Sequence, residues 1–244
     1  MDILYVVGSG STWSNNELRY SLRSIAKFGR NIERVYLAGY KPAFVSEEVR
    51  HIPCTDDSKR KHKNIMHKVL TAIEKSNISN RFLISSDDHF YIRETDFNRL
   101  PVYYQLRALP QTFSEKQLKN NYYKSLADTR SLLTKWGLPT YQTNPHCNTH
   151  FDTTLYRMAQ PLFFEAMELP YGGELNCLMG NLLISAGEKP SFFKDCKIDT
   201  FYNEEDLLQR LKDVECFSIA DTAIQYGIGE YLQRLFPNKC KYEK

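Results

Sequence analysis

The fold is decided by one stretch of the chain, Arg81-Phe82-Leu83-Ile84-Ser85-Ser86-Asp87-Asp88-His89. A short apolar run bounded by polar residues is typical of a buried β-strand. Two consecutive carboxylates at its end place oxygen ligands at the rim of a sheet, where hard cations such as Mn²⁺ or Mg²⁺ bridge to phosphates. We therefore expect Asp87 and Asp88 to bind a divalent metal ion, with His89 either as a third ligand or as a packed side chain. Because aspartate is also common in turns, the alternative is a purely structural turn.

The segments before this strand alternate between strand and helix. Residues 2–7 and 35–38 are short apolar runs, and residues 50–53 form a third such piece. Apolar residues recur at helical spacing in residues 18–26 and again in residues 65–73. This order predicts an α/β fold in which a mostly parallel sheet is flanked by helices. Ligands of such open sheets bind at the carboxyl ends of the strands.

Length and composition limit the classes of protein. A chain of 244 residues that is 42% hydrophobic and 25% charged can bury one substantial core, so we expect a single domain. Helical patterns return at residues 122–136 and 161–169, with glycine and proline interrupting both neighbourhoods. The formal charge of +3 suits an anionic ligand but gives no particular support to binding of DNA or RNA.

Cysteine spacing and hydropathy bear on the compartment. The six cysteines show no CxxC spacing, and no basic, apolar leader is visible at the start of the chain. No apolar run approaches the roughly 20 residues that a membrane helix requires. We therefore expect a cytoplasmic protein with reduced thiols and no integral membrane segment.

A loop of small residues, Gly8-Ser9-Gly10-Ser11, follows the first strand. Its small side chains would let backbone amides approach a base, a ribose or a phosphate. The spacing matches neither GxGxxG nor GxxxxGK[ST], so the loop is a generic ligand loop rather than a known phosphate-binding motif.

Polar residues on the two predicted helices are further candidates for binding a nucleotide. Asn16 begins the first helix, and Arg19 and Arg23 lie one turn apart on the same face. The alternative for both arginines is a solvated basic face. Lys63 and Asn64 end a charged segment before the second helix, which is expected either to close over a ligand or to keep the loop in water.

Three segments resemble the central conserved region of the Stealth family. They read Asn-Asn-Glu-Leu-Arg-Tyr-Ser-Leu-Arg-Ser-Ile at 15–25, Ile-Glu-Arg-Val-Tyr at 32–36 and Phe-Leu-Ile-Ser-Ser-Asp-Asp-His-Phe at 82–90. The Stealth family contains sugar-1-phosphate transferases, and its core is similar to the GT-A nucleotide-sugar fold. The resemblance covers the chain up to about residue 95, and the ordered series is more specific than any one of its pieces.

The resemblance also implies roles farther along the chain. Asn148-Thr149-His150 resembles the later Stealth segment that carries a catalytic histidine, so His150 inherits an acid/base or substrate-contact role, with His146 as a competitor. The family's arginine-bearing motif has no clear counterpart, since Gly172-Gly173-Glu174-Leu175-Asn176 stands in its place. In this respect the chain looks closer to compact bacterial or phage glycosyltransferase-like relatives.

The resemblance and the acidic strand end together imply a metal-dependent glycosyltransferase. It would move a sugar from a nucleotide-sugar donor to a hydroxyl acceptor, most simply a glycan, with Asp87 on the donor ribose or metal and Asp88 on the metal. Either His150 or Asp152 would activate the acceptor. Residues 1–100 would form the donor and metal half of a GT-A-like domain spanning 1–244, and residues 101–244 would form the acceptor-side half.

Three alternatives stay open at this stage. The first is transfer of sugar-1-phosphate, as in Stealth enzymes. The second is a phage-type glycosyltransferase acting on modified DNA bases, for which the near-neutral charge gives no support. The third is a non-catalytic module that binds a nucleotide or a glycan.

Overall fold

A computed structural model describes residues 1–244 and contains one five-stranded central sheet. The strand order is β4-β3-β1-β5-β9, with bounds β1 Asp2–Val7, β3 Arg34–Gly39, β4 Val49–Ile52, β5 Arg81–Ser85 and β9 Thr149–Asp152. Four strands are parallel, and only β9 runs antiparallel to its neighbour β5. The predicted α/β fold with a mostly parallel sheet is confirmed.

Alternation along the strands sends side chains to two separate cores. From β1, Leu4 packs into a cluster with helix α2 (Lys61–Lys75) and helix α7 (Leu175–Ser185), whereas Ile3 and Tyr5 pack against helix α1 (Asn16–Phe28). Because successive side chains of a strand point to opposite faces, a sheet covered on both sides needs apolar residues at nearly every position. The unbroken apolar run of residues 3–7 meets that need.

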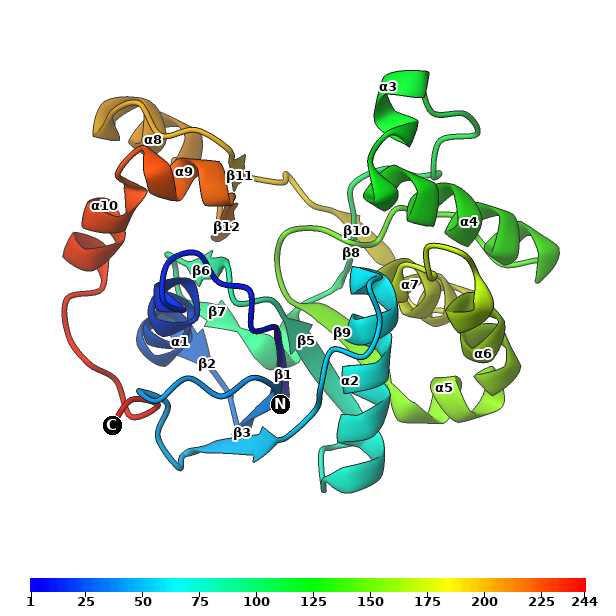
Figure 1. Cartoon of the computed structure of the whole chain (residues 1–244), viewed down its shortest axis with the longest axis horizontal. Helices are drawn as coiled ribbons and strands as arrows, with labels where there is room; N and C mark the ends of the chain where they lie inside the picture. The colour runs from blue at the N-terminus through cyan, green and yellow to red at the C-terminus, as the bar shows by residue number, and fades with distance from the viewer.

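Helices α4 (Asn121–Lys135), α5 (Thr153–Met158) and α6 (Gln160–Glu168) extend the α2 side of the molecule (Figure 1). The two helical patterns of the second half are therefore confirmed to within one residue. Six further short elements are β2 Gly29–Arg30, β7 Thr95–Asp96, η1 Phe97–Arg99, β8 Val102–Tyr104, α3 Glu115–Leu118 and β10 Pro190–Phe192. No helix combines the length and the apolar character needed to cross a bilayer.

A second sheet begins immediately after the two aspartates. It has the order β11-β12-β6, with β6 at His89–Tyr91, β11 at Lys197–Ile198 and β12 at Cys216–Ile219. Helices α8 (Glu204–Leu211), α9 (Asp221–Gln225) and α10 (Ile228–Leu235) cover it and share a third apolar cluster with Phe90 and Phe217. The chain thus returns, near its C-terminus, to the segment that follows Asp88.

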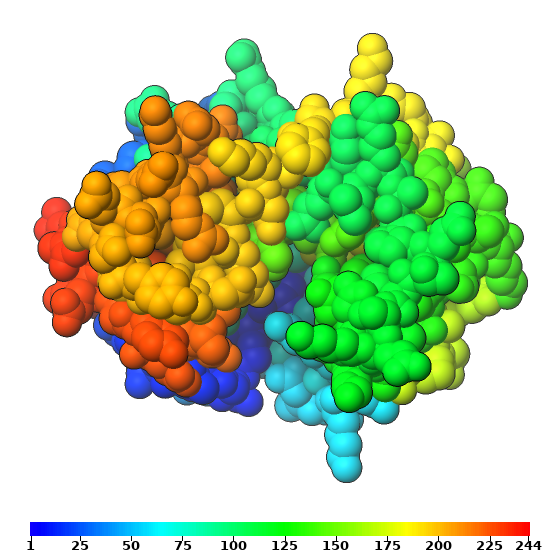
Figure 2. All heavy atoms as spheres, turned by 90° about the horizontal axis from the view of Figure 1, so that it is seen from above, coloured from blue at the N-terminus to red at the C-terminus, as the bar shows by residue number.

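These additions form two lobes on either side of the central sheet. Figure 1 places α8, α9 and α10 on one side and α4 to α7 on the other. Viewed from above, an orange and red lobe and a green lobe flank a hollow, and blue residues of the N-terminal segment lie at its floor beside the cyan start of α2 (Figure 2). The hollow opens at the edge where the parallel strands end, as expected for the ligand site of an open sheet.

Candidate functional site

Asp87 and Asp88 occupy the turn between β5 and β6, where the two sheets meet. Both side chains are half-buried, and neither forms an ion pair with a lysine or an arginine. The one ionic neighbour of Asp88 is the Nε2 atom of His89, at 3.8 Å from Oδ1. A structural turn would normally have its carboxylates hydrogen-bonded or exposed, so this pair is left available for a ligand.

Negative charge is crowded around Asp87. Removal from water and, after it, the charges of Asp88 and Glu17 together raise the pKa of its carboxyl to about 7, while the charge of Lys61 acts in the opposite direction. Glu17 is buried, and its Oε2 atom has no hydrogen-bond partner. Carboxylates that raise one another's pKa repel one another, so a bound cation would relieve the repulsion.

These residues fit a divalent metal ion shared with a ligand better than a closed metal cage. No group of three or more histidine, cysteine, aspartate and glutamate side chains is gathered closely enough to hold a cation alone. Mg²⁺ and similar ions are commonly held by one or two carboxylates while substrate phosphates and water complete the shell. The oxygen-rich pair Asp87 and Asp88, with the unpartnered Oε2 of Glu17 nearby, suits that kind of site.

His89 is buried beside the carboxylates. Removal from water lowers its pKa to about 4, although the charge of Asp88 works in the opposite direction. A neutral imidazole is the form that ligates metals. Its Nδ1 atom has no partner, which leaves both expected roles, ligand and packed side chain, compatible with the geometry.

A histidine–aspartate pair lies against the same small sheet. The Nδ1 atom of His146 is 2.7 Å from Oδ2 of Asp195, and the backbone N–H of His146 donates to Oδ1 at 2.9 Å. Burial raises the pKa of Asp195, but the hydrogen bonds from His146 outweigh it and hold the pKa below its usual value. An ionised Asp195 fixes the proton on Nδ1 and leaves Nε2 as a free acceptor on a partly exposed ring.

Two contacts place this pair next to the acidic turn. The Sγ atom of Cys216, on β12, lies 3.8 Å from the carbonyl oxygen of His146. Strand β12 pairs with β6, so that Ser218 stands opposite His89. In addition, the charges of His146 and Asp195 both act on His89. The sequence suggested His146 only as a competitor of His150, because its partner Asp195 lies far along the chain.

The loop after β1 is held at the same edge of the sheet. Lys68 is buried, and its ammonium donates to the carbonyl of Val7 at 3.0 Å and pairs with Asp56 at 2.5 Å. A Cβ atom on Gly8 would lie 3.6 Å from Asp56, whereas one on Gly10 would meet nothing within 4 Å. Ser9 and Gly10 are exposed. The loop is therefore anchored at one end and open to a ligand at the other.

Arg19 and Arg23 both contact the C-terminal tail. Arg23 makes two hydrogen bonds to the carboxylate of Glu243, at 2.7 and 2.9 Å, and a third to the carbonyl of Phe236. Arg19 lies 3.5 Å from the same carboxylate and donates to Asn16. Glu243 thus offsets one of the two positive charges, and the Nε atom of Arg19 has no hydrogen-bond partner. Arg23 and Asn16 are therefore engaged within the protein, whereas Arg19 is engaged only in part.

Lys63 and Asn64 differ from each other. The side chain of Asn64 accepts from the backbone N–H of Ser58 at 2.9 Å and donates to the Ser58 carbonyl at 2.7 Å, which closes the loop before α2. Lys63 forms no ion pair, and its Cγ atom lies close to Gly172, 3.0 Å from where a Cβ atom on that glycine would be. Asn64 therefore shapes the loop, and Lys63 keeps a free ammonium near the start of α2.

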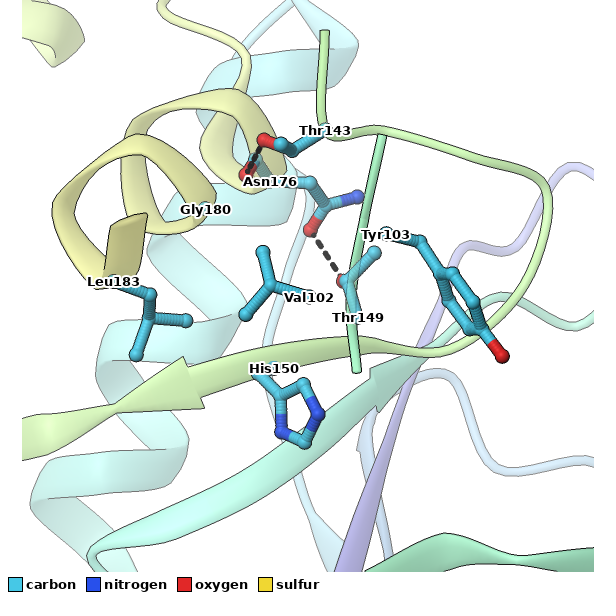
Figure 3. Close-up of a pocket in the computed structure, with 8 residues that line it drawn as sticks. All are labelled: Val102, Tyr103, Thr143, Thr149, His150, Asn176, Gly180 and Leu183. Atoms are coloured by element: carbon cyan, nitrogen blue, oxygen red, sulfur yellow. Dashed lines mark hydrogen bonds between the residues drawn. The ribbon is translucent and has the colours of Figure 1, made fainter. Parts of the chain in front are cut away.

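His150 lies apart from the acidic turn. Its Nε2 atom donates to the carbonyl of Leu100 at 2.7 Å, and its ring borders a cavity of only about 10 Å³ (Figure 3). In the same view, Thr149 and Thr143 are hydrogen-bonded to Asn176 across that cavity. A space of this size holds at most one water molecule. It has no room for a donor or an acceptor.

Asp152 lies at the opposite end of the sheet. In the antiparallel pairing of β5 and β9 it stands opposite Arg81, at the start of β5. As the N-cap of α5, its Oδ1 atom accepts hydrogen bonds from the N–H groups of Thr154 and Leu155. From Arg81 to Ser85 the strand spans roughly 13 Å. The structure therefore brings neither His150 nor Asp152 to Asp87 and Asp88.

Comparisons with known proteins find distant similarities among solved structures, and two of these structures are of LgtC. No protein-family model matches the chain, and no curated protein matches it. A structure of galactosyltransferase LgtC in complex with donor and acceptor sugar analogues is 10% identical, with 99% of this chain and 97% of that chain covered and a TM-score of 0.48. An active-site mutant of LgtC is 11% identical, with 96% and 95% covered and a TM-score of 0.47. At these values neither similarity assigns a fold family or a function.

Proposed function

We propose that this chain is a metal-dependent glycosyltransferase of the GT-A type that uses a nucleotide-sugar donor. The observation that carries the proposal is the pair Asp87 and Asp88, crowded by Glu17 and left without a basic partner at the carboxyl edge of the sheet. Partly buried carboxylates that repel one another and have no basic partner are costly, and their place at the edge where ligands of open sheets bind points to a cationic ligand. A divalent ion bound there would stabilise the charge of the departing diphosphate.

The surrounding residues suit the two ends of the donor. The backbone of Gly8, Ser9 and Gly10 lies at the end of β1, the neighbour of β5, and is open to a nucleoside. Lys61, in the first turn of α2, is close enough for its charge to act on Asp87 and would attract the diphosphate. Lys63 lies two residues farther along the same helix. Residues 1–100 thus supply the donor side of this proposal.

His146 is the better candidate for activating the acceptor. In the transfer, the bond between the anomeric carbon and the diphosphate oxygen breaks, the acceptor oxygen bonds to that carbon, and the hydroxyl proton leaves. The free Nε2 atom of His146 would accept that proton, while Asp195 stabilises the resulting imidazolium through Nδ1–H. The Nδ1 atom of His150 has no hydrogen-bond partner, but it is buried, and the cavity beside the ring is too small for an acceptor.

The proposal is tested by calorimetric titration of UDP and GDP with and without Mn²⁺. We expect binding that strengthens at least tenfold with Mn²⁺ in the wild type and in Asp213→Asn, which changes an exposed aspartate away from the site. Asp88→Asn should lose that strengthening while keeping its circular dichroism spectrum. Binding that ignores Mn²⁺, or that is unchanged in Asp88→Asn, would contradict the metal-dependent mechanism.

A further inference from the structure

A second cavity lies on the C-terminal lobe, and none of its lining residues belongs to the acidic turn. Its volume is about 430 Å³, and it lies between β11 and α8, bordered by Ile198, Phe201, Tyr202, Asn203, Gln209 and Arg210 among others. This volume is within the range of pockets that hold small molecules, roughly 300 to 1,000 Å³. Nothing in the metal and donor site described above uses these residues.

The lining combines an exposed aromatic ring with fixed polar groups. Tyr202 is 80% exposed, so packing does not explain its position. Arg210 is held by a hydrogen bond of 2.6 Å to the carbonyl of Lys197, and Asn203 donates to Asp206 at 2.8 Å. A ring face beside preorganised amide and guanidinium groups suits a ligand with one apolar face and an edge of hydroxyls, which is the chemistry of a sugar ring.

The local charge favours a neutral ligand. The cavity wall carries one carboxylate, Asp206, and one guanidinium, Arg210. In the same first turn of α8, Glu204 is paired with Arg234, and Glu205 adds one further negative charge. An anionic ligand, such as a nucleotide or an acidic glycan, would therefore meet a small excess of negative charge. A neutral oligosaccharide meets no such penalty.

The cavity is also placed within reach of the acidic turn. Ile198, on its wall, pairs with Ile219 of β12, and Ser218 of the same strand stands opposite His89. Two strand spacings separate β11 from β6, a distance of roughly 10 Å. The lobe that carries the cavity forms one wall of the central hollow (Figure 2). A chain of sugars could therefore lie with one end in the cavity and the other toward Asp88.

We propose that this cavity binds a neutral oligosaccharide, as a subsite that holds the non-reacting sugars of the acceptor. The role of the bound sugars as part of the acceptor rests on the proposed function, whereas the binding of sugar in the cavity does not. It identifies the acceptor as a glycan of two or more units, with Tyr202 stacking on a ring and Gln209 and Arg210 contacting hydroxyls.

Saturation-transfer NMR with a panel of neutral di- and trisaccharides (lactose, maltotriose, cellotriose and chitotriose) tests the subsite. We compare the wild type, Tyr202→Ala and Tyr226→Ala, the last of which removes another exposed tyrosine that does not line the cavity. Transfer to sugar ring protons is expected in the wild type and in Tyr226→Ala, with at least a fivefold loss in Tyr202→Ala. Equal signals in all three proteins, or no signal for any panel member, overturn the subsite.

Titration of UDP with Mn²⁺ in the same proteins separates this inference from the proposed function. Tyr202→Ala should bind UDP as the wild type does, because the ring lies outside the donor site. If sugar binding depends on Tyr202 while UDP never binds, the subsite stands and the transferase proposal fails. If UDP competes with the sugars for the Tyr202 cavity, the assignment to a neutral glycan is overturned.

Discussion

Two histidines four residues apart provide a test of catalysis at the scale of single residues. His146→Gln removes the Nε2 atom of a ring that Asp195 holds through Nδ1, so the release of UDP or GDP from a nucleotide sugar should slow about 100-fold. His150→Gln changes a ring that donates to Leu100 next to a water-sized cavity, so turnover should fall less than about threefold. Equal losses in the two variants, with both folded by circular dichroism, would remove His146 from the mechanism.

The sequence predicted the local part of the site and not the part that depends on distant contacts. Asp87 and Asp88 were identifiable because an adjacent apolar strand marks their position. The partner of His146 could not be identified, since Asp195 reaches it only through folding. The same limit applies to Arg19 and Arg23, whose helical spacing was clear but whose shared ionic partner, Glu243, lies at the far end of the chain.

At the scale of elements, α7 begins at a buried carboxylate. Glu174 is the N-cap, and its Oε2 atom accepts from the backbone N–H of Cys177 at 2.7 Å. Burial raises its pKa to about 6, from 4.5, although the hydrogen bonds of the cap oppose this. Because the folded-state pKa is the higher one, the ionised carboxylate weakens folding, and stability falls as pH rises from about 4.5 through 6.

Glu174→Gln should remove that pH-dependent loss while keeping an oxygen for the cap. Relative to the wild type, its free energy of unfolding should improve by about 2 kcal/mol between pH 4 and pH 7, as the shift of pKa implies. Urea titrations at both pH values measure this difference. Glu230→Gln, which changes an exposed residue in the first turn of α10, is the control and should show no such change. A difference that is constant with pH would contradict the role of ionisation.

The elements themselves were predictable to different degrees. β1, β5, α4 and α6 match their predicted ranges closely, since each follows a local periodicity of apolar residues. The pairing β11-β12-β6 was not predicted, because these strands have two to four residues and β6 lies far from β11 and β12 along the chain. Short strands carry too few positions for alternation to be recognised.

At the scale of the whole molecule, the second half of the chain supplies both walls of the hollow. Helices α4 to α7 pack on the α2 side, whereas β11, β12 and helices α8 to α10 pack on the side of α1 and β6. The C-terminal tail then binds to the first helix, since the side chain of Glu243 is 2% exposed and pairs with Arg23. The backbone N–H of Lys244 also donates to the carbonyl of Phe44 at 2.8 Å. The wall that carries the proposed sugar subsite is thus tied to the donor half at its far end.

This tail contact should contribute to stability without contributing to nucleotide binding. A double-mutant cycle of Arg23→Met and Glu243→Gln should give a coupling energy of about 2 kcal/mol, because removing one partner leaves the other buried without its two hydrogen bonds. The exposed pair Arg234 and Glu204, with side chains 57% and 48% accessible, is the control and should couple by less than about 0.5 kcal/mol. Mn²⁺-dependent binding of UDP should stay within about twofold of wild type in Glu243→Gln. Equal coupling in the two cycles would show that the tail contact does not stabilise the fold. A large loss of UDP affinity in Glu243→Gln would show that Arg19 and Arg23 contribute to donor binding.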